Sequence, residues 1–310
     1  MNGMSYFENF DLKSIENMEL FAKQVVEGFI IGLHKSPFHG FSVEFAEHRI
    51  YNPGDTTKNI DWKVYARTDK LFTKRFEEET NLRCHIVIDS SSSMYFPKDD
   101  KSQPINKLQF SALAAASLMN LLKKQRDAFG LTLFDKDIKV LTREKSSTSH
   151  YRLLLQYLDQ LIHDTTPEKK TNLIDTLHQV ADRVHRRSLI VIFSDMLDDP
   201  EKSEALFSAL QHLKYNKHEV ILFHTTDHKL EQEFEFENRP YQFIDLESGE
   251  NIRLQAHEVK EFYTEKMEAY KKEIRTKCLQ YKIDLVEADI RKGFIPVLQS
   301  YMVKRKKMIK

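Results

Sequence analysis

Two hydrophobic patterns alternate along the chain from residue 83 onwards. Short, nearly continuous apolar runs are separated by longer segments in which apolar residues return every three or four positions. The short runs predict buried strands, and the longer segments predict helices. The predicted strands are 85–89, 127–135, 138–143, 188–195, 219–227 and 283–290, and the predicted helices are 105–125, 151–162, 173–184, 201–214, 258–281 and 294–306.

This alternation predicts a doubly wound α/β fold with a mainly parallel sheet. Continuous apolar strands are typical of parallel sheets that carry helices on both faces. The second and third strands are joined only by the Lys136–Asp137 turn, which is too short for a crossover, so one edge strand should be antiparallel. Segment 241–255 predicts a hairpin at an edge.

The first 81 residues have a different character. An apolar stripe predicts a helix over 13–26, and an irregular, aromatic segment with a turn at Pro53-Gly54-Asp55 follows it. Alternating residues near 71–76 predict a strand that closes this segment. We therefore predict two domains: residues 1–81, a small mixed α+β segment, and residues 82–310, the doubly wound domain.

Composition narrows the possible partners and the compartment. Lysine plus arginine number 47, as do aspartate plus glutamate, so no net charge attracts nucleic acid or an anionic membrane. The two distant cysteines exclude a disulfide framework and are typical of a reducing compartment. No secretion signal is evident, and the longest early apolar run, Phe29–Leu33, is far below the roughly 20 residues of a membrane span. We expect a cytoplasmic protein without membrane spans or nucleic-acid partners.

Aspartates at the ends of predicted strands are the candidate chemistry of this chain. Asp89 closes strand 85–89, and Asp195 closes strand 188–195. Open parallel sheets bind ligands beyond the carboxyl ends of their strands, where the strand order reverses. If both strands flank that point, the two carboxylates repel each other unless a cation lies between them. Hard divalent cations prefer oxygen ligands, so the aspartates indicate a divalent-cation site.

Four consecutive serines follow Asp89, and they form an Asp-x-Ser-x-Ser pattern. Ser91 and Ser93 can turn their hydroxyl oxygens inward when the loop curls over the strand end. Hydroxyls are neutral ligands, so the cation stays electrophilic and keeps a position for an outside carboxylate. Thr171, in another loop, could supply a further neutral oxygen. We predict a metal site formed by Asp89, Ser91, Ser93, Thr171 and Asp195, with an inert serine-rich loop as the alternative.

These five residues resemble the metal ion-dependent adhesion site of von Willebrand factor A domains. The segment before them resembles a bacterial family called domain of unknown function 58 (DUF58), and this resemblance extends over roughly 25–305. The matching positions are Arg49, Tyr51, Gly54, Asp55, Ile60, Asp61, Trp62, Ala66, Arg67, Leu71 and Glu79, followed by Val87–Met94. The resemblance implies a von Willebrand A-type, Rossmann-like fold for residues 82–310.

The same resemblance implies a metal-dependent adaptor and not an enzyme. Members of the family resemble non-catalytic proteins that act beside MoxR-type AAA+ ATPases in the assembly or maturation of other proteins. The implied ion is Mg²⁺, with Mn²⁺ and Ca²⁺ as alternatives, and a protein partner would complete its shell with a carboxylate. Ser91, Ser93 and Thr171 would bind the ion directly, and Asp89 and Asp195 would act through water or hydrogen bonds.

Two other functions stay open. A metal-dependent phosphoester hydrolase could use the same aspartates, but such enzymes need a second carboxylate two residues after the first, where this chain has Ser91. The sequence has neither a G-x-S-x-G elbow nor a glycine-rich phosphate loop. The other alternative is a structural subunit with a vestigial, empty metal site.

Two further residue sets have structural explanations. Trp62, with its neighbours Asp61 and Arg67, could form a second functional surface, but we interpret Trp62 as an anchor that packs the N-terminal segment onto the sheet domain. His224 and His228 have a loose, ligand-like spacing without a third ligand nearby. Packed or solvated histidines are therefore favoured over a zinc site.

Overall fold

The computed structural model describes most of the chain, in two units. The described residues are 15–34, 45–50, 60, 62–76, 82–98, 105–163, 172–196, 203–246 and 249–309. One unit comprises Met1–Phe29 and Leu82–Met308, and the other comprises Ile30–Asn81. The predicted division placed residues 1–81 together, whereas the structure groups the chain up to Phe29 with the sheet unit.

Among the described residues, six strands form the sheet of the larger unit, in the order β10-β7-β6-β3-β4-β5. Their bounds are β3 Arg83–Asp89, β4 Ala128–Phe134, β5 Ile138–Leu141, β6 Leu189–Ser194, β7 Glu219–Thr226 and β10 Asp284–Asp289. All neighbouring strands pair in parallel except β5, which pairs antiparallel with β4. The strand order reverses between β3 and β6, as in a doubly wound sheet. The predicted fold class is therefore confirmed.

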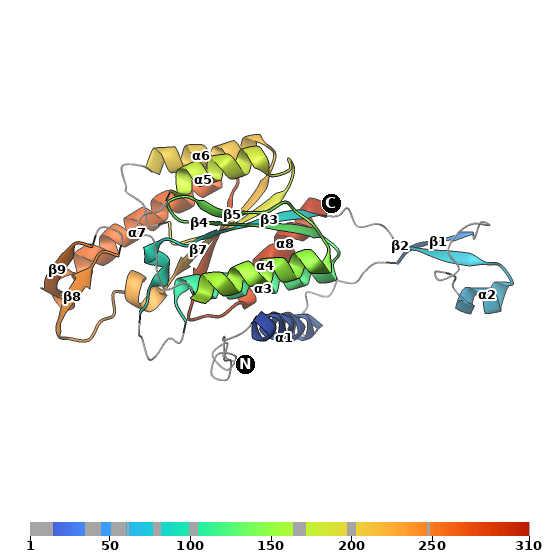
Figure 1. The fold of residues 1–310 in the computed structure, drawn as a ribbon, viewed down its shortest axis with the longest axis horizontal. Helices are drawn as coiled ribbons and strands as arrows, with labels where there is room; N and C mark the ends of the chain where they lie inside the picture. Colours follow the sequence, from blue (N-terminus) through green and yellow to red (C-terminus); the bar gives the residue numbers. More distant parts are fainter. Residues whose placement is uncertain are drawn as a thin grey trace. The chain divides into compact units, whose positions relative to one another are not determined.

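Helices cover both faces of this sheet (Figure 1). The helices on one face are α5 Leu173–Arg183, α6 Ser203–Tyr215 and α7 Ala256–Gln280. The helices on the other face are α1 Ile15–His34, α3 Lys107–Lys124, α4 Thr148–His163 and α8 Ile295–Ile309. Of the helices in the described part of the chain, none combines the length and hydropathy that a membrane crossing requires.

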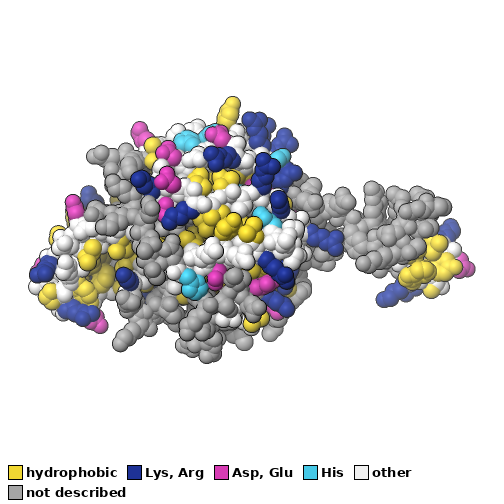
Figure 2. Space-filling model, viewed as in Figure 1, with side chains coloured by type: hydrophobic (Ala, Val, Ile, Leu, Met, Phe, Trp, Pro, Cys, Tyr) yellow, Lys and Arg dark blue, Asp and Glu magenta, His cyan; other side chains and the backbone are white. Residues whose placement is uncertain are grey.

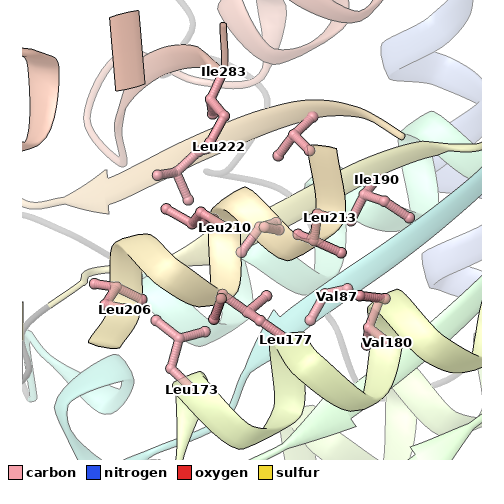
Figure 3. Packing of buried hydrophobic residues seen from close by; sticks show 14 of the residues in the cluster. Val87, Leu173, Leu177, Val180, Ile190, Leu206, Leu210, Leu213, Leu222 and Ile283 are labelled. Atoms are coloured by element: carbon pink, nitrogen blue, oxygen red, sulfur yellow. The ribbon is translucent and has the colours of Figure 1, made fainter. Parts of the chain in front are cut away.

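Aliphatic side chains from both layers fill the core under α5 and α6 (Figure 3). Leu177 and Val180 of α5 and Leu210 of α6 pack with Val87 of β3 and Leu222 of β7, and all five are fully buried. On α5 the buried positions return every three or four residues, which is why this segment folds as an amphipathic helix.

On the opposite face, α3 is the central helix. Its side chains are buried at every position from 110 to 122, so it is surrounded by protein over most of its length. Phe110 stacks on Phe294, just before α8, with ring centroids 4.8 Å apart. Phe21 of α1 meets the same Phe294 ring edge-on at 5.5 Å. These rings attach α1 and the start of α8 to α3.

A buried ion pair closes the end of the sheet at which the parallel strands begin. Asp127 comes directly before β4 and is 0% exposed. Arg305 of α8 donates from Nε to Asp127 Oδ2 at 3.0 Å, and the backbone N–H of Leu82 donates to Oδ1 at 3.1 Å. Asp127 thus joins α8 to the starts of β3 and β4.

Two small antiparallel pairs complete the described structure. β8 Pro240–Ile244 pairs with β9 Asn251–Gln255, so the hairpin predicted for 241–255 is present, but it forms a sheet of its own and not an edge of the large sheet. In the smaller unit, β1 Phe45–Ile50 pairs with β2 Phe72–Phe76, and helix α2 Trp62–Thr68 lies between them in the chain. The sequence predicts β2 but neither β1 nor α2.

Some large apolar side chains lie on the surface. Trp62 is 60% exposed and meets Tyr65 edge-on, with ring centroids 6.1 Å apart. Figure 2 shows hydrophobic side chains on α2 and over the β8–β9 hairpin, where Ile244 and Ile252 are exposed. The anchoring of Trp62 on the sheet unit stays a prediction, because each unit is described by itself.

Candidate metal site

Each of the parallel strands described above reaches an aspartate at the same edge of the sheet. The aspartates are Asp89 and Asp289, which end β3 and β10, and Asp135, Asp195 and Asp227, which directly follow β4, β6 and β7. β3 and β6 are neighbours, with Ile88 opposite Phe193. The structure therefore brings Asp89 and Asp195 to adjacent strands at the point where the strand order reverses.

Asp89 differs from the other strand-end aspartates in its partners. The cationic partners of the others are Lys107 on Asp195 (2.8 Å), Arg291 on Asp227 (2.6 Å), Lys139 on Asp135, and Lys292 near Asp289 (3.7 Å). Within the described residues, the partners of Asp89 are neutral. The backbone N–H of Ser91 donates to its Oδ1 at 3.0 Å, and the hydroxyl of Ser194 donates to its Oδ2 at 2.9 Å. The charge of Asp89 is therefore not balanced by a directly bound cationic side chain in this part of the chain.

The environment of Asp89 disfavours its ionised form. The residue is only 2% exposed. Burial first, and then the negative charge of Asp195, raise the pKa of Asp89 to about 7, although hydrogen bonds from Ser91 and Ser194 act in the opposite direction. A nearby divalent cation would reverse this balance, because it favours the carboxylate over the acid.

The four serines after β3 divide into two pairs. The hydroxyls of Ser90 and Ser92 donate to backbone carbonyls of other segments, at 2.7 and 2.8 Å. Ser91 and Ser93 instead place their Oγ atoms 3.1 Å from each other. Ser91 is fully buried, whereas Ser93 is partly exposed. The two serines of the Asp-x-Ser-x-Ser pattern are therefore the two whose hydroxyls meet.

Thr171 lies outside the described residues, so its part in the site stays a prediction. The next residue, Asn172, is described. Its backbone N–H donates to the carbonyl oxygen of Asp135 at 2.8 Å, just beyond β4. Helix α5 therefore begins at the same edge of the sheet as Asp89 and Asp195.

The described donors fit a hard divalent cation. Two adjacent ligands of an octahedral Mg²⁺ lie about 2.9 Å apart, because the ion–oxygen distance is about 2.0–2.1 Å. The 3.1 Å between the Oγ atoms of Ser91 and Ser93 is close to that value. Across the described residues, no three His, Cys, Asp or Glu side chains gather into a metal cage. A divalent-cation site among these residues would therefore need the serine hydroxyls in addition to the carboxylates.

Lys107 is a part of the site that the sequence analysis misses. Its side chain, at the first position of α3, is 0% exposed, and its Nζ lies 2.8 Å from Asp195 Oδ2 and 2.6 Å from Glu231 Oε1. Burial alone would lower the pKa of Lys107, but the two carboxylates raise it above its usual value. A signal is present in the sequence, since Lys107 is the one charged residue between positions 105 and 122.

Two more residues near the end of β6 take part in the hydrogen-bond network. The hydroxyl of Ser194 donates to Asp89 and accepts from the backbone N–H of Met196 at 2.9 Å, so it connects β6 to β3. His224 of β7 donates from Nε2 to the carbonyl oxygen of Asp195 at 2.9 Å. Burial lowers the pKa of His224 to about 4, so this histidine is neutral at pH 7. His224 is therefore a packed histidine, as the sequence predicts, and not a zinc ligand.

A second polar cluster, inside the sheet, has the order of hydrogen bonds found in hydrolase triads. His85 Nε2 lies 2.8 Å from Thr132 Oγ1, and His85 Nδ1 lies 2.6 Å from Glu144 Oε1. Thr132 and His85 are both 0% exposed, so a substrate has no access to the threonine hydroxyl. The cluster satisfies buried polar groups and does not form an active site.

We predict that Gly130→Ala disrupts this cluster. An added Cβ would lie 2.8 Å from His85 Nδ1 and 3.1 Å from the carbonyl oxygen of Thr142, which is closer than such contacts normally come. The variant should lose about 1–3 kcal/mol of unfolding free energy, as overpacked cores do. Urea denaturation measures this loss. A value within about 0.5 kcal/mol of the wild type would contradict a tightly fixed His85 ring.

Comparison with known proteins places most of the chain in one family. A profile of the family described as "Protein of unknown function DUF58" matches residues 47–273. Curated relatives include "Uncharacterized protein Rv1480" of Mycobacterium tuberculosis and "Uncharacterized protein Mb1516" of Mycobacterium bovis. Each is 24% identical over 188 residues, which are 59% of this chain and 56% of the relative. The match thus spans only about half the length of these relatives.

Solved structures with a similar backbone path include BatB from Bacteroides thetaiotaomicron and the SpRpn10 VWA domain. BatB has a TM-score of 0.42 and 12% identity, and the match covers 73% of this chain and 99% of that one. The SpRpn10 VWA domain has a TM-score of 0.32 and 17% identity, with 46% and 75% covered. The fold assignment rests on the strand order of the sheet. Because the family profile covers well over half of the sequence, including β3 and β6, the chain belongs to the DUF58 family.

Proposed function

We propose that this protein is a divalent-cation-dependent protein-binding adaptor. Its family and its doubly wound fold favour a protein-interaction domain. The observation that carries the proposal is the meeting of the Ser91 and Ser93 hydroxyls beside Asp89, a buried carboxylate whose partners among the described residues are neutral. Thr171 and Asp195 complete the proposed set. The proposed ion is Mg²⁺, with Mn²⁺ and Ca²⁺ as alternatives.

The residues of the site have distinct proposed roles. Ser91, Ser93 and Thr171 would hold the ion directly, and Asp89 and Asp195 would hold it through water or by orienting the hydroxyls. The hydrogen bond from the Ser91 backbone to Asp89 keeps the serine loop folded over the end of β3. When bound, the cation offers a coordination position to a carboxylate of another protein.

The partner side of the proposal rests on the family resemblance. We propose that a protein partner donates this carboxylate in a complex with a MoxR-type AAA+ ATPase, and that the complex assembles or matures other proteins in the cytoplasm. Purified MoxR-type ATPase from the same organism should be captured by the immobilised protein in Mg²⁺ but not in chelator. Equal capture in both buffers would count against a cation-dependent contact.

We predict that Ser93→Ala weakens cation binding and Ser90→Ala does not. The two substitutions remove the same hydroxyl from the same loop, but Ser93 faces Ser91 whereas Ser90 donates to a backbone carbonyl at 2.7 Å. Calorimetric titration with Mg²⁺ and Mn²⁺ should show at least about a tenfold loss of affinity for Ser93→Ala, since losing or misorienting a ligand commonly changes affinity by that factor. Equal affinities for both variants would remove Ser93 from the site.

A metal-free structural site is the second candidate. The observation that favours it is Lys107, whose ammonium group already supplies a positive charge to Asp195 at 2.8 Å. In that case the wild-type protein should show no binding heat with Mg²⁺ or Mn²⁺ at millimolar concentrations, and its thermal stability should be unchanged by chelator.

The geometry gives less support to a phosphoester hydrolase. An aspartate nucleophile must reach the phosphorus atom of its substrate, but Asp89 is 2% exposed and both of its oxygens accept hydrogen bonds. Hydrolysis of p-nitrophenyl phosphate that requires Mg²⁺ and disappears in Asp89→Ala would favour the enzyme over the adaptor.

A further inference from the structure

Lys107 occupies an environment that a lysine enters only with strong partners. Its ammonium lies between Asp195 and Glu231, and the three side chains are 0%, 2% and 13% exposed. These two carboxylates belong to separate parts of the chain: Asp195 follows β6, and Glu231 lies in the single π-helical turn His228–Gln232 after β7. Lys107 therefore connects the candidate site to a neighbouring segment.

The local position of Lys107 is unfavourable for a positive charge. Lys107 is the first residue of α3, directly after the N-cap Asn106, and helix N-termini favour negative charge. The first turn of α3 contains no acidic residue that would offset this effect. Burial of an ammonium group adds a further penalty unless it is paired. The carboxylates of Asp195 and Glu231 therefore stabilise the buried ammonium group of Lys107, and the N-terminus of α3 does not.

The formal charges around the site depend on this lysine. When a bound cation keeps Asp89 ionised, the carboxylates of Asp89, Asp195 and Glu231 carry three negative charges and Lys107 carries one positive charge. One divalent cation would bring this group of four side chains to formal neutrality. Without the lysine, the same ion would no longer be opposed by this positive charge and would be held more tightly, because charges interact strongly where side chains are buried.

We propose that Lys107 is a built-in counter-charge that limits the cation affinity of the site, so that the loaded site can still accept a partner's carboxylate. This inference rests on the proposed function. With Lys107 present, the loaded group is neutral, and an incoming carboxylate meets no net repulsion. In this account Lys107 is a positioning and charge-balancing residue that does not touch the ion.

The test compares variants of the full chain by calorimetric titration with Mg²⁺ or Mn²⁺ alone. Lys107→Gln keeps a hydrogen-bond donor but removes the charge, and it should bind the cation roughly tenfold more tightly than the wild type, or better. Glu231→Gln leaves Lys107 with less compensation and should bind several-fold more weakly. Lys139→Gln is the matched control: Lys139 pairs with Asp135 at the end of the next strand and is 38% exposed, so the affinity should hardly change.

A second readout does not depend on measuring affinity directly. The rise in Tm between chelator and saturating Mg²⁺ should be larger for Lys107→Gln than for the wild type, because tighter binding stabilises the folded state more. A lysine with only a structural role would lower both melting temperatures by the same amount. If Lys107→Gln fails to fold, Glu231→Gln carries the comparison: it removes one negative charge from the group, so its rise in Tm should be smaller than that of the wild type.

The outcomes separate this inference from the proposed function. If the wild type and Lys107→Gln bind with equal affinity, the inference is overturned while the cation site stands. If neither protein binds a cation, both the inference and the proposed function fail. If only Lys107→Gln binds, Lys107 does oppose cation binding, but the wild-type protein has no loaded site for a partner's carboxylate, so the proposed function fails and the inference fails with it.

Discussion

Asp89→Asn should abolish divalent-cation binding and at the same time stabilise the metal-free protein at neutral pH. The amide keeps the size of the side chain and an oxygen that can accept from the backbone N–H of Ser91, but it carries no charge. We expect the affinity for Mg²⁺ to fall by at least about a hundredfold, because the buried charge that favours the ion is gone. Few substitutions remove a function and gain stability together, so this combination is diagnostic.

The sign of the stability change follows from the pKa of Asp89. That pKa is about 7 in the folded protein, against an ordinary value of 3.8. Between these values the folded state keeps a proton that the unfolded state releases, so stability is lost as the pH rises from about 4 to about 7 and then stays constant. A shift of this size corresponds to at most about 4 kcal/mol. Asp89→Asn has no ionisable group at this position, so its stability does not fall with rising pH for this reason.

Urea denaturation in chelator at about pH 5 and about pH 8 measures the effect. Between about pH 5 and about pH 8 the wild type should lose more unfolding free energy than Asp89→Asn does. At about pH 8 the variant should be the more stable of the two proteins. Asp135→Asn is the matched control, since Asp135 follows the neighbouring strand but pairs with Lys139. An Asp89→Asn protein that is destabilised near pH 8, or that binds Mg²⁺ like the wild type, would contradict the proposed role of Asp89.

Arg305→Met should cause a large loss of stability without touching the candidate site. It leaves Asp127 buried, 0% exposed, without the guanidinium that donates to it at 3.0 Å. Breaking a buried ion pair on one side typically lowers the free energy of unfolding by about 3–5 kcal/mol. Urea denaturation measures it.

The control for Arg305→Met is Arg275→Met. Arg275 pairs with Glu287 at 2.8 Å but is 64% exposed, so its loss should change stability by at most about 1 kcal/mol. Cation affinity should be the same in both variants, because Asp127 lies where β4 begins and the candidate site lies where the strands end. A similar, small loss in both variants would show that Asp127 is not sealed from water.

The sheet could be predicted because its strands are buried on both faces. β6 is buried at every position, so its sequence is a continuous apolar run that ends at Asp195. β1 and α2 lack such a signal. β1 is defined by its backbone pairing with β2, in which Phe45 is the pairing partner of Phe76. α2 has no buried residue that would give its sequence a periodic apolar face. Pairings between distant segments of this kind do not leave a local pattern.

The candidate site could also be predicted only where its residues form a local sequence pattern. Strand ends alone would not select Asp89, because Asp135 and Asp227 also follow parallel strands. The Asp-x-Ser-x-Ser pattern selects it, and the meeting of the Ser91 and Ser93 hydroxyls agrees with that choice. A sequence pattern could not show which cation approaches a carboxylate from elsewhere in the chain.

Lys107 illustrates this limit. It lies 88 residues before Asp195 and 124 residues before Glu231. The sequence around Lys107 does not indicate that it pairs with either residue. The visible signal is a single charged residue within positions 105–122, which predicts only that the lysine needs a buried partner. The fold supplies two, and they lie at the site.

The most direct test of the central claim is a crystal soaked in Mn²⁺ and measured at the manganese absorption edge. We expect one anomalous peak at the carboxyl ends of β3 and β6, about 2.0–2.3 Å from the Oγ atoms of both Ser91 and Ser93, and no such peak in Asp89→Asn. A well-ordered wild-type crystal in which the two hydroxyls have no ion between them at saturating Mn²⁺, or in which the ion binds elsewhere, would contradict it.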